Sequence, residues 1–350
     1  MPGNGFELTN SFLEEFDMTF HPYLSQRGSQ LMQACVQEPV QGAVKYVRFQ
    51  NVGDAHWVTS HGDPTNYTTI EYDRRRLKPV GLECAITLDA YDMVQQGTPD
   101  PGMLAQQAAN ACGRKIDECI LQGINGTAYT ESQGEVVLSG AESVTAGATP
   151  AAVVANYDKT QTIAWNDATA CGDLTDSPLI THVGLSTSKI AKAIKKLKAA
   201  NNQVGPFVCV TNAHGMLSLR ADKRAASTDF NDIHAFAQGV MNPYAGVDAF
   251  AEIASTLGGK SKVGENGQYN ADGLNVKYAW VYALPQIKLG CSMPLHMENG
   301  LNAERHLDQV LIYKGMYDCT RLYEESVVRI EILEDVTQIA GQTLSDILAH

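Results

Sequence analysis

The chain lacks the features that mark secreted, membrane-spanning or disulfide-stapled proteins. Its 350 residues contain no apolar run approaching the ~20 residues that cross a bilayer. Residues 1–9 have neither the basic start nor the apolar core of a signal peptide. The eight cysteines form no CxxC pair and no regular spacing, and a chain of this length needs no covalent staples. We therefore expect a cytoplasmic protein with reduced, buried thiols.

Motifs for metal-dependent or nucleophilic catalysis are also missing. The nine histidines are scattered without an HExxH pattern, and no Gly-x-Ser-x-Gly turn occurs. Residues 254–261 resemble a phosphate-binding loop with alanine in place of the first glycine. Such a loop needs a helix directly after it, whereas residues 263–267 are rich in turn formers. We favour a mobile loop over a nucleotide site, and assign no catalytic residue, cofactor or metal.

What the chain does contain is the composition of a globular, acidic protein. Apolar residues make up 44% and charged residues 19%, which favours a folded chain over a disordered one. The length exceeds that of a single core, so two lobes are expected. Acidic residues outnumber basic ones by 39 to 26, a net charge of −13. This balance disfavours tight nonspecific binding of nucleic acid, which depends on Lys and Arg.

The most informative segment is a long polar hairpin, residues 41–89. Its tip, residues 51–69, has only Val52, Trp57 and Val58 as large apolar side chains. Ordering each residue costs about 1–2 kcal/mol of backbone entropy, and burial at roughly 25 cal/mol per Å² has to offset it. A hairpin of this composition therefore needs another large surface to lie on. We expect that surface to belong to another copy of the chain.

After the hairpin, the sequence predicts a strand and then a long helix. Residues 82–88 alternate apolar and polar side chains, as a half-buried strand does. Asp100 as N-cap, Pro101 at the first position and Gly123 at the end bracket a helix of about 22 residues. Its apolar stripe includes Cys112 and Cys119, which favours a core role for both thiols. Its many small residues predict a neighbouring backbone at close range.

A second lobe is expected beyond residue 177. Residues 186–200 predict a helix with Ile190, Ile194 and Leu197 inside. Its five lysines are placed outside, where a solvated face is favoured over a partner surface: Lys189, Lys192, Lys195, Lys196 and Lys198. A short helix is expected at residues 213–219, and strands are expected at residues 207–210, 277–284, 287–289, 309–314, 320–323 and 328–332. We expect the C-terminal strands to pair with residues 82–88.

The candidate functional residues are inter-subunit contacts on the hairpin. Arg74, Arg75 and Arg76 form the densest charge run, and strand alternation places Arg74 and Arg76 on one face and Arg75 on the other. Their predicted partners are acidic groups of another copy, namely Glu14, Glu15 and Asp17. The alternative is a solvated strand, where an ion pair contributes at most ~1 kcal/mol. Trp57, His56 and His61 on the tip complete the candidate set.

The order of these parts resembles the major capsid protein of tailed bacteriophages, an α+β fold that encapsulins and the herpesvirus capsid floor also look to share. The likeness spans about residues 26–333, and no single motif carries it alone. It depends on residues 26–31 (QRGSQL), 72–76 (YDRRR), 108–128 and 321–330 (RLYEESVVRI).

The resemblance implies a division of the chain and a function. The implied parts are an N-terminal arm (1–43), an extended loop (44–80), a peripheral domain with the long spine helix (81–177 and 304–334), an axial domain (178–303) and a C-terminal tail (335–350). The implied function is self-assembly, in the bacterial host cytoplasm, into an icosahedral shell of hexamers and pentamers that encloses double-stranded DNA without reading its sequence. A cargo-holding compartment of the encapsulin kind and a nucleotide-dependent enzyme remain as rivals.

The resemblance also suggests how the virion is completed. Some members of the fold crosslink a loop lysine to a peripheral-domain asparagine, but this chain has no lysine at positions 48–76 and no asparagine at positions 304–350. A noncovalent shell is therefore expected. Because only about 40 residues precede the loop, we expect scaffolding by a separate protein, along with a portal and a possible decoration protein as partners, and no membrane.

Overall fold

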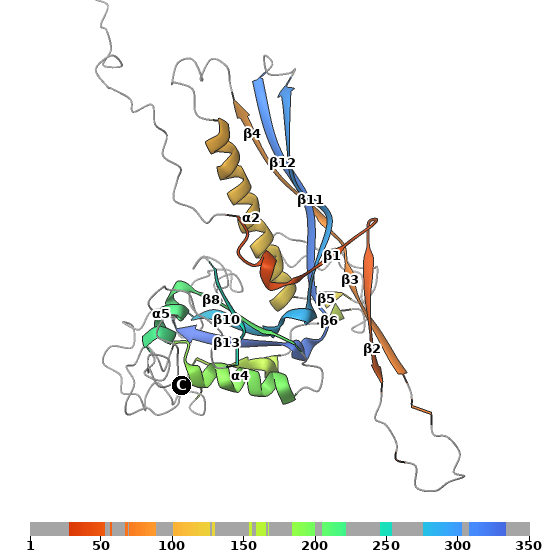
Figure 1. The fold of residues 1–350 in the computed structure, drawn as a ribbon, viewed down its shortest axis with the longest axis vertical. Helices are drawn as coiled ribbons and strands as arrows, with labels where there is room; N and C mark the ends of the chain where they lie inside the picture. Colours follow the sequence, from red (N-terminus) through yellow and green to blue (C-terminus); the bar gives the residue numbers. More distant parts are fainter. Residues whose placement is uncertain are drawn as a thin grey trace, which may run out of the picture.

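In the computed structural model, one β-sheet runs alongside a long helix, a second β-sheet lies near the lower end of that helix, and a two-stranded ribbon projects from the junction (Figure 1). The strands of one sheet rise to one end of the molecule, and the ribbon extends toward the other (Figure 1). The residues described are 28–52, 57, 67–68, 70–88, 101–126, 128–129, 154–155, 159–165, 167, 184–199, 205–221, 246–253, 276–302 and 308–333.

The first sheet has four strands in the order β1-β11-β12-β4. These are β1 (Val36–Pro39), β11 (Ile287–Asn302), β12 (Asp308–Arg321) and β4 (Val80–Leu88). Side chains of β4 alternate between half-buried and exposed from Val80 to Thr87, which confirms the strand predicted at residues 82–88. The strands predicted at residues 309–314 and 320–323 are one strand, β12, which pairs with β4 as expected. Gly315, which separates the two predicted segments, lies within the continuous strand and forms no turn.

The long helix α2 (Pro101–Asn125) packs on one face of this sheet. It begins at the predicted proline but continues two residues past Gly123, so the prediction that Gly123 ends the helix is wrong. The glycine is needed for close packing instead: a Cβ at Gly123 would lie 2.6 Å from backbone atoms of Cys319 on β12. A Cβ at Gly113 would likewise overlap the backbone of Gly28. The prediction that small residues admit a neighbouring backbone is confirmed.

The second sheet has five strands in the order β7-β13-β10-β8-β9. These are β7 (Thr162–Ile163), β13 (Val327–Leu333), β10 (Val276–Ala283), β8 (Phe207–Asn212) and β9 (Ala249–Ile253). The prediction that residues 328–332 pair with residues 82–88 is wrong, because β13 pairs with β10 and β7. Its five buried side chains, among seven residues, point to both faces, and only a sheet covered on both sides accommodates them.

Helices cover this second sheet on one side. They are α4 (Thr187–Ala199) and α5 (Ala213–Ala221), close to the predicted helices. Ile190, Ile194 and Leu197 of α4 are buried as expected. The prediction of an outward Lys189 is wrong: it is fully buried, and its Nζ donates to the carbonyl oxygens of Trp165 at 2.9 Å and Gly184 at 2.8 Å. These two carbonyls replace the water that the ammonium loses.

The sheets do not follow the predicted division of the chain at two places. Strand β11 falls within residues 178–303 but pairs with β12 in the four-stranded sheet. Strand β13 falls within residues 304–334 but lies in the five-stranded sheet. The crossing points are short 3-10 turns: η6 (Leu284–Gln286) joins β10 to β11, and η7 (Glu324–Ser326) joins β12 to β13.

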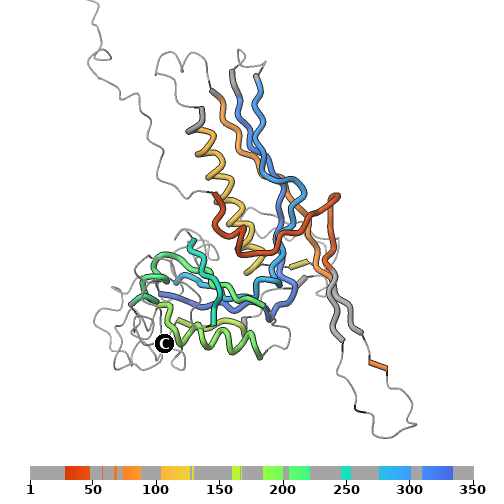
Figure 2. The backbone as a smooth tube through the Cα atoms, viewed as in Figure 1, coloured from red at the N-terminus to blue at the C-terminus, as the bar shows by residue number. Residues whose placement is uncertain are grey.

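The ribbon consists of β2 (Lys45–Val52) and β3 (Ile70–Leu77), which pair only with each other among the described residues. It continues from the four-stranded sheet through the short link Lys78–Pro79 and runs away from the body of the molecule (Figure 2). The predicted hairpin is therefore confirmed, with the tip largely outside the described residues. The smaller elements are η2 (Met32–Ala34), β5 (Ala128–Tyr129), β6 (Val154–Ala155) and η4 (Lys159–Gln161).

Candidate functional site

The hairpin has two chemically distinct faces. Cross-strand partners share a face, and the register pairs Tyr46 with Arg76 and Arg48 with Arg74. Arg74 is exposed, and its guanidinium lies 5.1 Å from the centroid of the Tyr46 ring. The exposed guanidinium of Arg74 is a cation that a carboxylate from outside the ribbon can reach.

The base of the hairpin is held by contacts within the chain. Arg75 is buried, and its Nη2 lies 3.7 Å from Oε1 of Glu324 in η7. Arg76 is also buried, with its guanidinium 4.6 Å from the ring centroid of Tyr129 on β5. Of the three predicted arginines, Arg75 and Arg76 are buried against their own chain, and Arg74 is exposed.

The link between hairpin and sheet is bound by the carboxylate of Asp318. Its Oδ2 accepts a hydrogen bond from the backbone N–H of Lys78 at 2.6 Å, and its Oδ1 accepts from the N–H of Cys319 at 2.9 Å. Burial raises the pKa of Asp318 to about 6, and the two amides and the charge of Arg76 offset only part of that rise. A buried carboxylate therefore fixes the point where the ribbon leaves the sheet.

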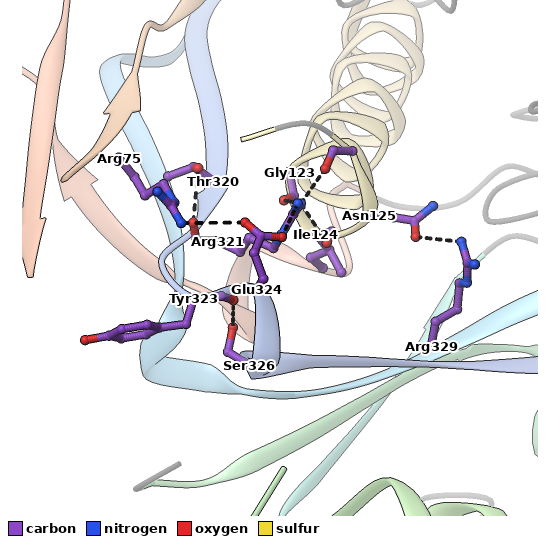
Figure 3. Close-up of polar contacts among 11 residues, drawn as sticks. Arg75, Gly123, Ile124, Asn125, Thr320, Arg321, Tyr323, Glu324, Ser326 and Arg329 are labelled. Carbon is purple, nitrogen blue, oxygen red and sulfur yellow. Dashed lines mark hydrogen bonds and ion pairs between the residues drawn. The ribbon is translucent and has the colours of Figure 1, made fainter. Parts of the chain in front are cut away.

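The C-terminal end of α2 meets both sheets at Arg321, the last residue of β12. Arg321 is fully buried, and its Nη1 donates to the carbonyl oxygens of Gly123, Ile124 and Gly126 (Figure 3). Its Nε and Nη2 both lie 2.6 Å from Oε2 of Glu324. A cation at the negative end of the helix dipole is stabilising, and here it also satisfies carbonyls that have no partner within the helix.

Arg329 on β13 provides a second connection to this helix end. Its Nη1 donates to Oδ1 of Asn125 at 3.2 Å (Figure 3). Its Nη2 donates to Oγ1 of Thr162 at 3.1 Å. Its guanidinium lies 4.4 Å from the ring centroid of Tyr278. The end of helix α2 is therefore joined to β12 by Arg321 and to the five-stranded sheet by Arg329.

The start of the described chain is anchored on α2 by a buried aspartate. The carboxylate of Asp117 accepts hydrogen bonds from Oγ of Ser29 at 2.5 Å and from the backbone N–H groups of Gln30 and Leu31, both at 3.1 Å. The N–H of Gly28 donates to Oδ1 of Asn110. The anchor lies directly beside Gly113, where the two backbones are closest.

Toward the hairpin tip, two aromatic side chains are almost fully solvent-exposed. Trp57 is 95% exposed and Tyr67 is 89% exposed. Burying a large aromatic side chain typically contributes 1.5–3 kcal/mol, so both are placed to gain from a partner surface. The remaining predicted contact residues lie outside the described residues: His56, His61, Glu14, Glu15 and Asp17.

Within the part of the chain that the structure describes, no group of three or more potential ligands is arranged for a metal ion. No helix there is long and apolar enough to span a bilayer. The seven cysteines described are free, and burial raises the pKa values of Cys35, Cys119 and Cys209 to about 12. Residues 254–261 lie outside the described residues.

Comparison with known proteins identifies the fold. The chain is similar to the capsid protein of cyanophage Pam1, with a TM-score of 0.63, 10% identity, and coverage of 95% of this chain and 99% of that one. It is also similar to those of cyanophage P-SCSP1u (TM-score 0.60, 13% identity, 93% and 94%) and Ralstonia phage GP4 (TM-score 0.60, 9% identity, 92% and 96%). Among curated proteins, none matches the sequence.

The family model for phage capsid proteins matches residues 8–334. The chain belongs to the phage capsid protein family. It is a structural protein, the major capsid subunit from which an oligomeric shell is built, and the fold is the α+β fold of tailed-phage capsids. The compartment and enzyme alternatives are not favoured by these comparisons.

Sequence reasoning found the hairpin and its exposed tryptophan but missed the residues that fix its base. Asp318 was not considered, and Arg321 and Glu324 entered only as part of the motif at residues 321–330. The sequence does carry a signal, because the oppositely charged Arg321 and Glu324 stand three positions apart. Buried charges of that kind almost always have partners.

Proposed function

We propose that copies of this chain assemble into an icosahedral shell of hexamers and pentamers that encloses double-stranded DNA. The observation that carries the proposal is the ribbon of β2 and β3, which leaves the body and has Trp57 95% exposed. An isolated two-stranded ribbon is marginally stable in water, so it needs a neighbour. The net charge of −13 suits a shell that encloses DNA without binding it tightly.

In this proposal the parts of the chain take different roles in the shell. The ribbon is the extended loop that lies on an adjacent subunit, and residues 1–43 form an arm that packs on another subunit. The sheet of β4, β11 and β12 with α2 is the peripheral domain. The sheet of β8, β9, β10 and β13 with α4 and α5 is the axial domain, and residues 335–350 form a tail.

We propose that Trp57, His56, His61 and Arg74 make the inter-subunit contacts on the ribbon, with Glu14, Glu15 and Asp17 of another copy as partners. The exposure of Arg74 and its register opposite Arg48 support this assignment. Arg75 and Arg76 support the contact by holding the base of the ribbon. Each inter-subunit contact is small, and stability comes from their number across the lattice.

The proposal extends to the other components of the particle. Assembly takes place in the bacterial host cytoplasm with a separate scaffolding protein, a portal and a possible decoration protein. No covalent crosslink forms between subunits, because the chain has no lysine at positions 48–76 and no asparagine at positions 304–350. Mature particles should therefore dissociate to single chains in denaturing gels, and a covalent ladder would contradict this.

Removing residues 51–69 tests the role of the hairpin. The shortened chain, with a short glycine link between β2 and β3, should keep its circular dichroism spectrum and its unfolding midpoint but form no shells by negative-stain microscopy. The full chain, expressed in parallel with its neighbouring genes, is the control. Normal shells from the shortened chain would contradict the proposed role. Nuclease-protected DNA in purified particles, rather than a packaged enzyme, would distinguish a virus from a compartment.

A further inference from the structure

Two cysteine thiols meet where α2 packs on the four-stranded sheet. Cys84 lies on β4, the edge strand of this sheet, and Cys112 lies on the buried stripe of α2. The strand and the helix run alongside each other (Figure 1), and the thiols of Cys84 and Cys112 make a side-chain hydrogen bond with each other. A disulfide joins two sulfurs about 2 Å apart, so the pair has only to close from hydrogen-bond contact.

The packing of α2 on β4 is close enough for two short side chains to touch. Ala108 stands one turn before Cys112 on the same face of the helix and is also buried, so no bulky side chain there holds the helix away from the strand. On β4, Cys84 shares its half-buried face with Leu82. Leu82 packs against the hydrophobic core that contains Ile116, one turn after Cys112. The face of β4 that carries Cys84 is therefore the face that α2 covers.

The two thiols differ in how easily a reagent reaches them. Cys84 is half-buried on a strand whose outer edge no described strand covers, so a small molecule can approach it from that edge. Cys112 is 1% exposed, and burial together with the neighbouring Cys84 raises its pKa to about 11. The thiolate is the reactive form of cysteine, so Cys112 reacts slowly with reagents in solution at neutral pH. Cys84 is therefore the thiol that reacts first.

The other described cysteines are less suited to this reaction. Four of them are buried, and burial raises their pKa values: Cys35, Cys119, Cys209 and Cys319. Cys291 on β11 is half-buried like Cys84, but its thiol makes a hydrogen bond with the side chain of Tyr317. Cys291 is therefore a matched control for Cys84, with similar exposure on the same sheet.

We propose that Cys84 and Cys112 form an intrachain disulfide when the protein meets an oxidising environment. The oxidant is a small-molecule disulfide such as oxidised glutathione. The thiolate of Cys84 attacks one sulfur of the oxidant, which releases one glutathione thiolate and leaves a mixed disulfide on Cys84. Cys112 then loses its proton and attacks the Cys84 sulfur, which releases the second glutathione. In total, two protein thiols lose two electrons and two protons, and the oxidant is reduced to two thiols.

The bond ties the edge strand of the sheet to the long helix. The two cysteines stand 28 positions apart in the chain, and a cross-link over a loop of that length stabilises a fold chiefly by restricting the unfolded chain. A reducing cytoplasm keeps the pair as thiols while subunits fold and assemble, and release from the host cell exposes it to oxidants. The use of the bond in a released particle rests on the proposed function, whereas the chemistry of the pair does not.

Peptide mapping of the parent chain tests the bond directly. The purified full chain is reduced, desalted, treated with oxidised glutathione and then blocked with iodoacetamide. Cleavage at Asp89 and Asp100 by an aspartate-specific protease separates the two cysteines. The expected product is a pair of peptides joined through Cys84 and Cys112, which dithiothreitol separates. A Cys84 that is alkylated, bound to glutathione or joined to another cysteine at the end of the reaction would overturn the inference.

Two matched substitutions separate this pair from the other half-buried thiol. Cys84→Ser removes the attacking thiol, so oxidation should leave its thermal unfolding midpoint unchanged. Cys291→Ser keeps the pair, so its midpoint should rise by about 5 °C on oxidation, as in the parent chain. Circular dichroism of each reduced variant establishes that it is folded. An equal rise in folded Cys84→Ser would overturn the inference.

Purified particles separate this inference from the proposed function. Shells assembled with the neighbouring gene products under reducing conditions would be oxidised and mapped in the same way, and their subunits should acquire the bond between Cys84 and Cys112. If the parent chain forms no shells, the proposed function fails, and the map of the free chain still decides the disulfide. If shells form while Cys84 and Cys112 stay thiols after oxidation, the inference fails and the proposed function stands.

Discussion

The two sheets of this subunit differ in how completely the chain covers them. In the five-stranded sheet, all six residues of β8 are buried, because α4 packs on one face and residues of α2 and η2 pack on the other. In the four-stranded sheet, β4 alternates between half-buried and exposed side chains, and α2 covers one face only. Among the described residues, one sheet is covered on both faces and the other is covered on one face only.

The difference separates folding from assembly. A sheet with two covered faces obtains its stability from its own chain, so it can form before any neighbour is present. A sheet with one face uncovered by the described residues gains further burial only when another surface packs on that face. Substitutions in the five-stranded sheet should therefore affect the single chain, and substitutions on the open face of the four-stranded sheet should affect the shell.

The largest effect is expected for Trp280→Ala in the five-stranded sheet. Trp280 is 1% exposed and packs edge-to-face on Tyr278, with ring centroids 6.0 Å apart. Removing a buried tryptophan costs about 3–5 kcal/mol of unfolding free energy. Urea unfolding of the unassembled chain measures it.

The comparison variant is Ile312→Ala on the open face of β12. Because Ile312 is only half-buried in the single chain, the loss should be about 1 kcal/mol. If the two variants destabilise the unassembled chain equally, the distinction between a completed sheet and an open one is incorrect.

Arg321→Met, at the junction of the two sheets, is expected to lower the unfolding free energy somewhat less than Trp280→Ala does. The substitution removes the donor to the carbonyls of Gly123, Ile124 and Gly126, and it removes the guanidinium that lies 2.6 Å from Oε2 of Glu324. Breaking a buried ion pair by removing one partner costs about 3 kcal/mol. The double variant Arg321→Met/Glu324→Gln is the control, since it removes the uncompensated charge as well.

Hydrogen exchange locates the effect of Arg321→Met. Amides of the last turn of α2 and of β5 should exchange faster, while those of β8 and β10 should be unchanged. An increase spread evenly over both sheets would instead indicate general destabilisation, and the junction would then have no separate role.

The hairpin was predictable because its signal is local. A stretch with only Val52, Trp57 and Val58 as large apolar residues is visible in the sequence alone, and so are the alternation of β4 and the proline that begins α2. These features depend on neighbouring residues and on the period of one element. The conclusion that the ribbon needs a partner followed from the same composition.

What the sequence did not reveal depends on residues far apart in the chain. Gly123 looks like a helix end because glycine commonly ends helices, but here it admits the backbone of Cys319, almost 200 positions away. Lys189 looks solvent-exposed from the helical pattern, and only the carbonyls of Trp165 and Gly184 explain its burial. The apolar alternation of β13 fits any sheet, so it does not identify β10 as the partner.

An effect smaller than that of Arg321→Met concerns pH and the link between the four-stranded sheet and the hairpin. The pKa of Asp318 is raised from 3.8 to about 6, so the folded chain binds this proton more tightly than the unfolded chain. The stabilisation from this group is complete below about pH 4 and is lost as the pH rises through 6, by about 2–3 kcal/mol. Asp318→Asn cannot titrate, so the difference in unfolding free energy between the parent chain and this variant should change by that amount between pH 4.5 and 7.5. A difference that is constant with pH would mean that Asp318 is solvated and does not hold the hairpin link.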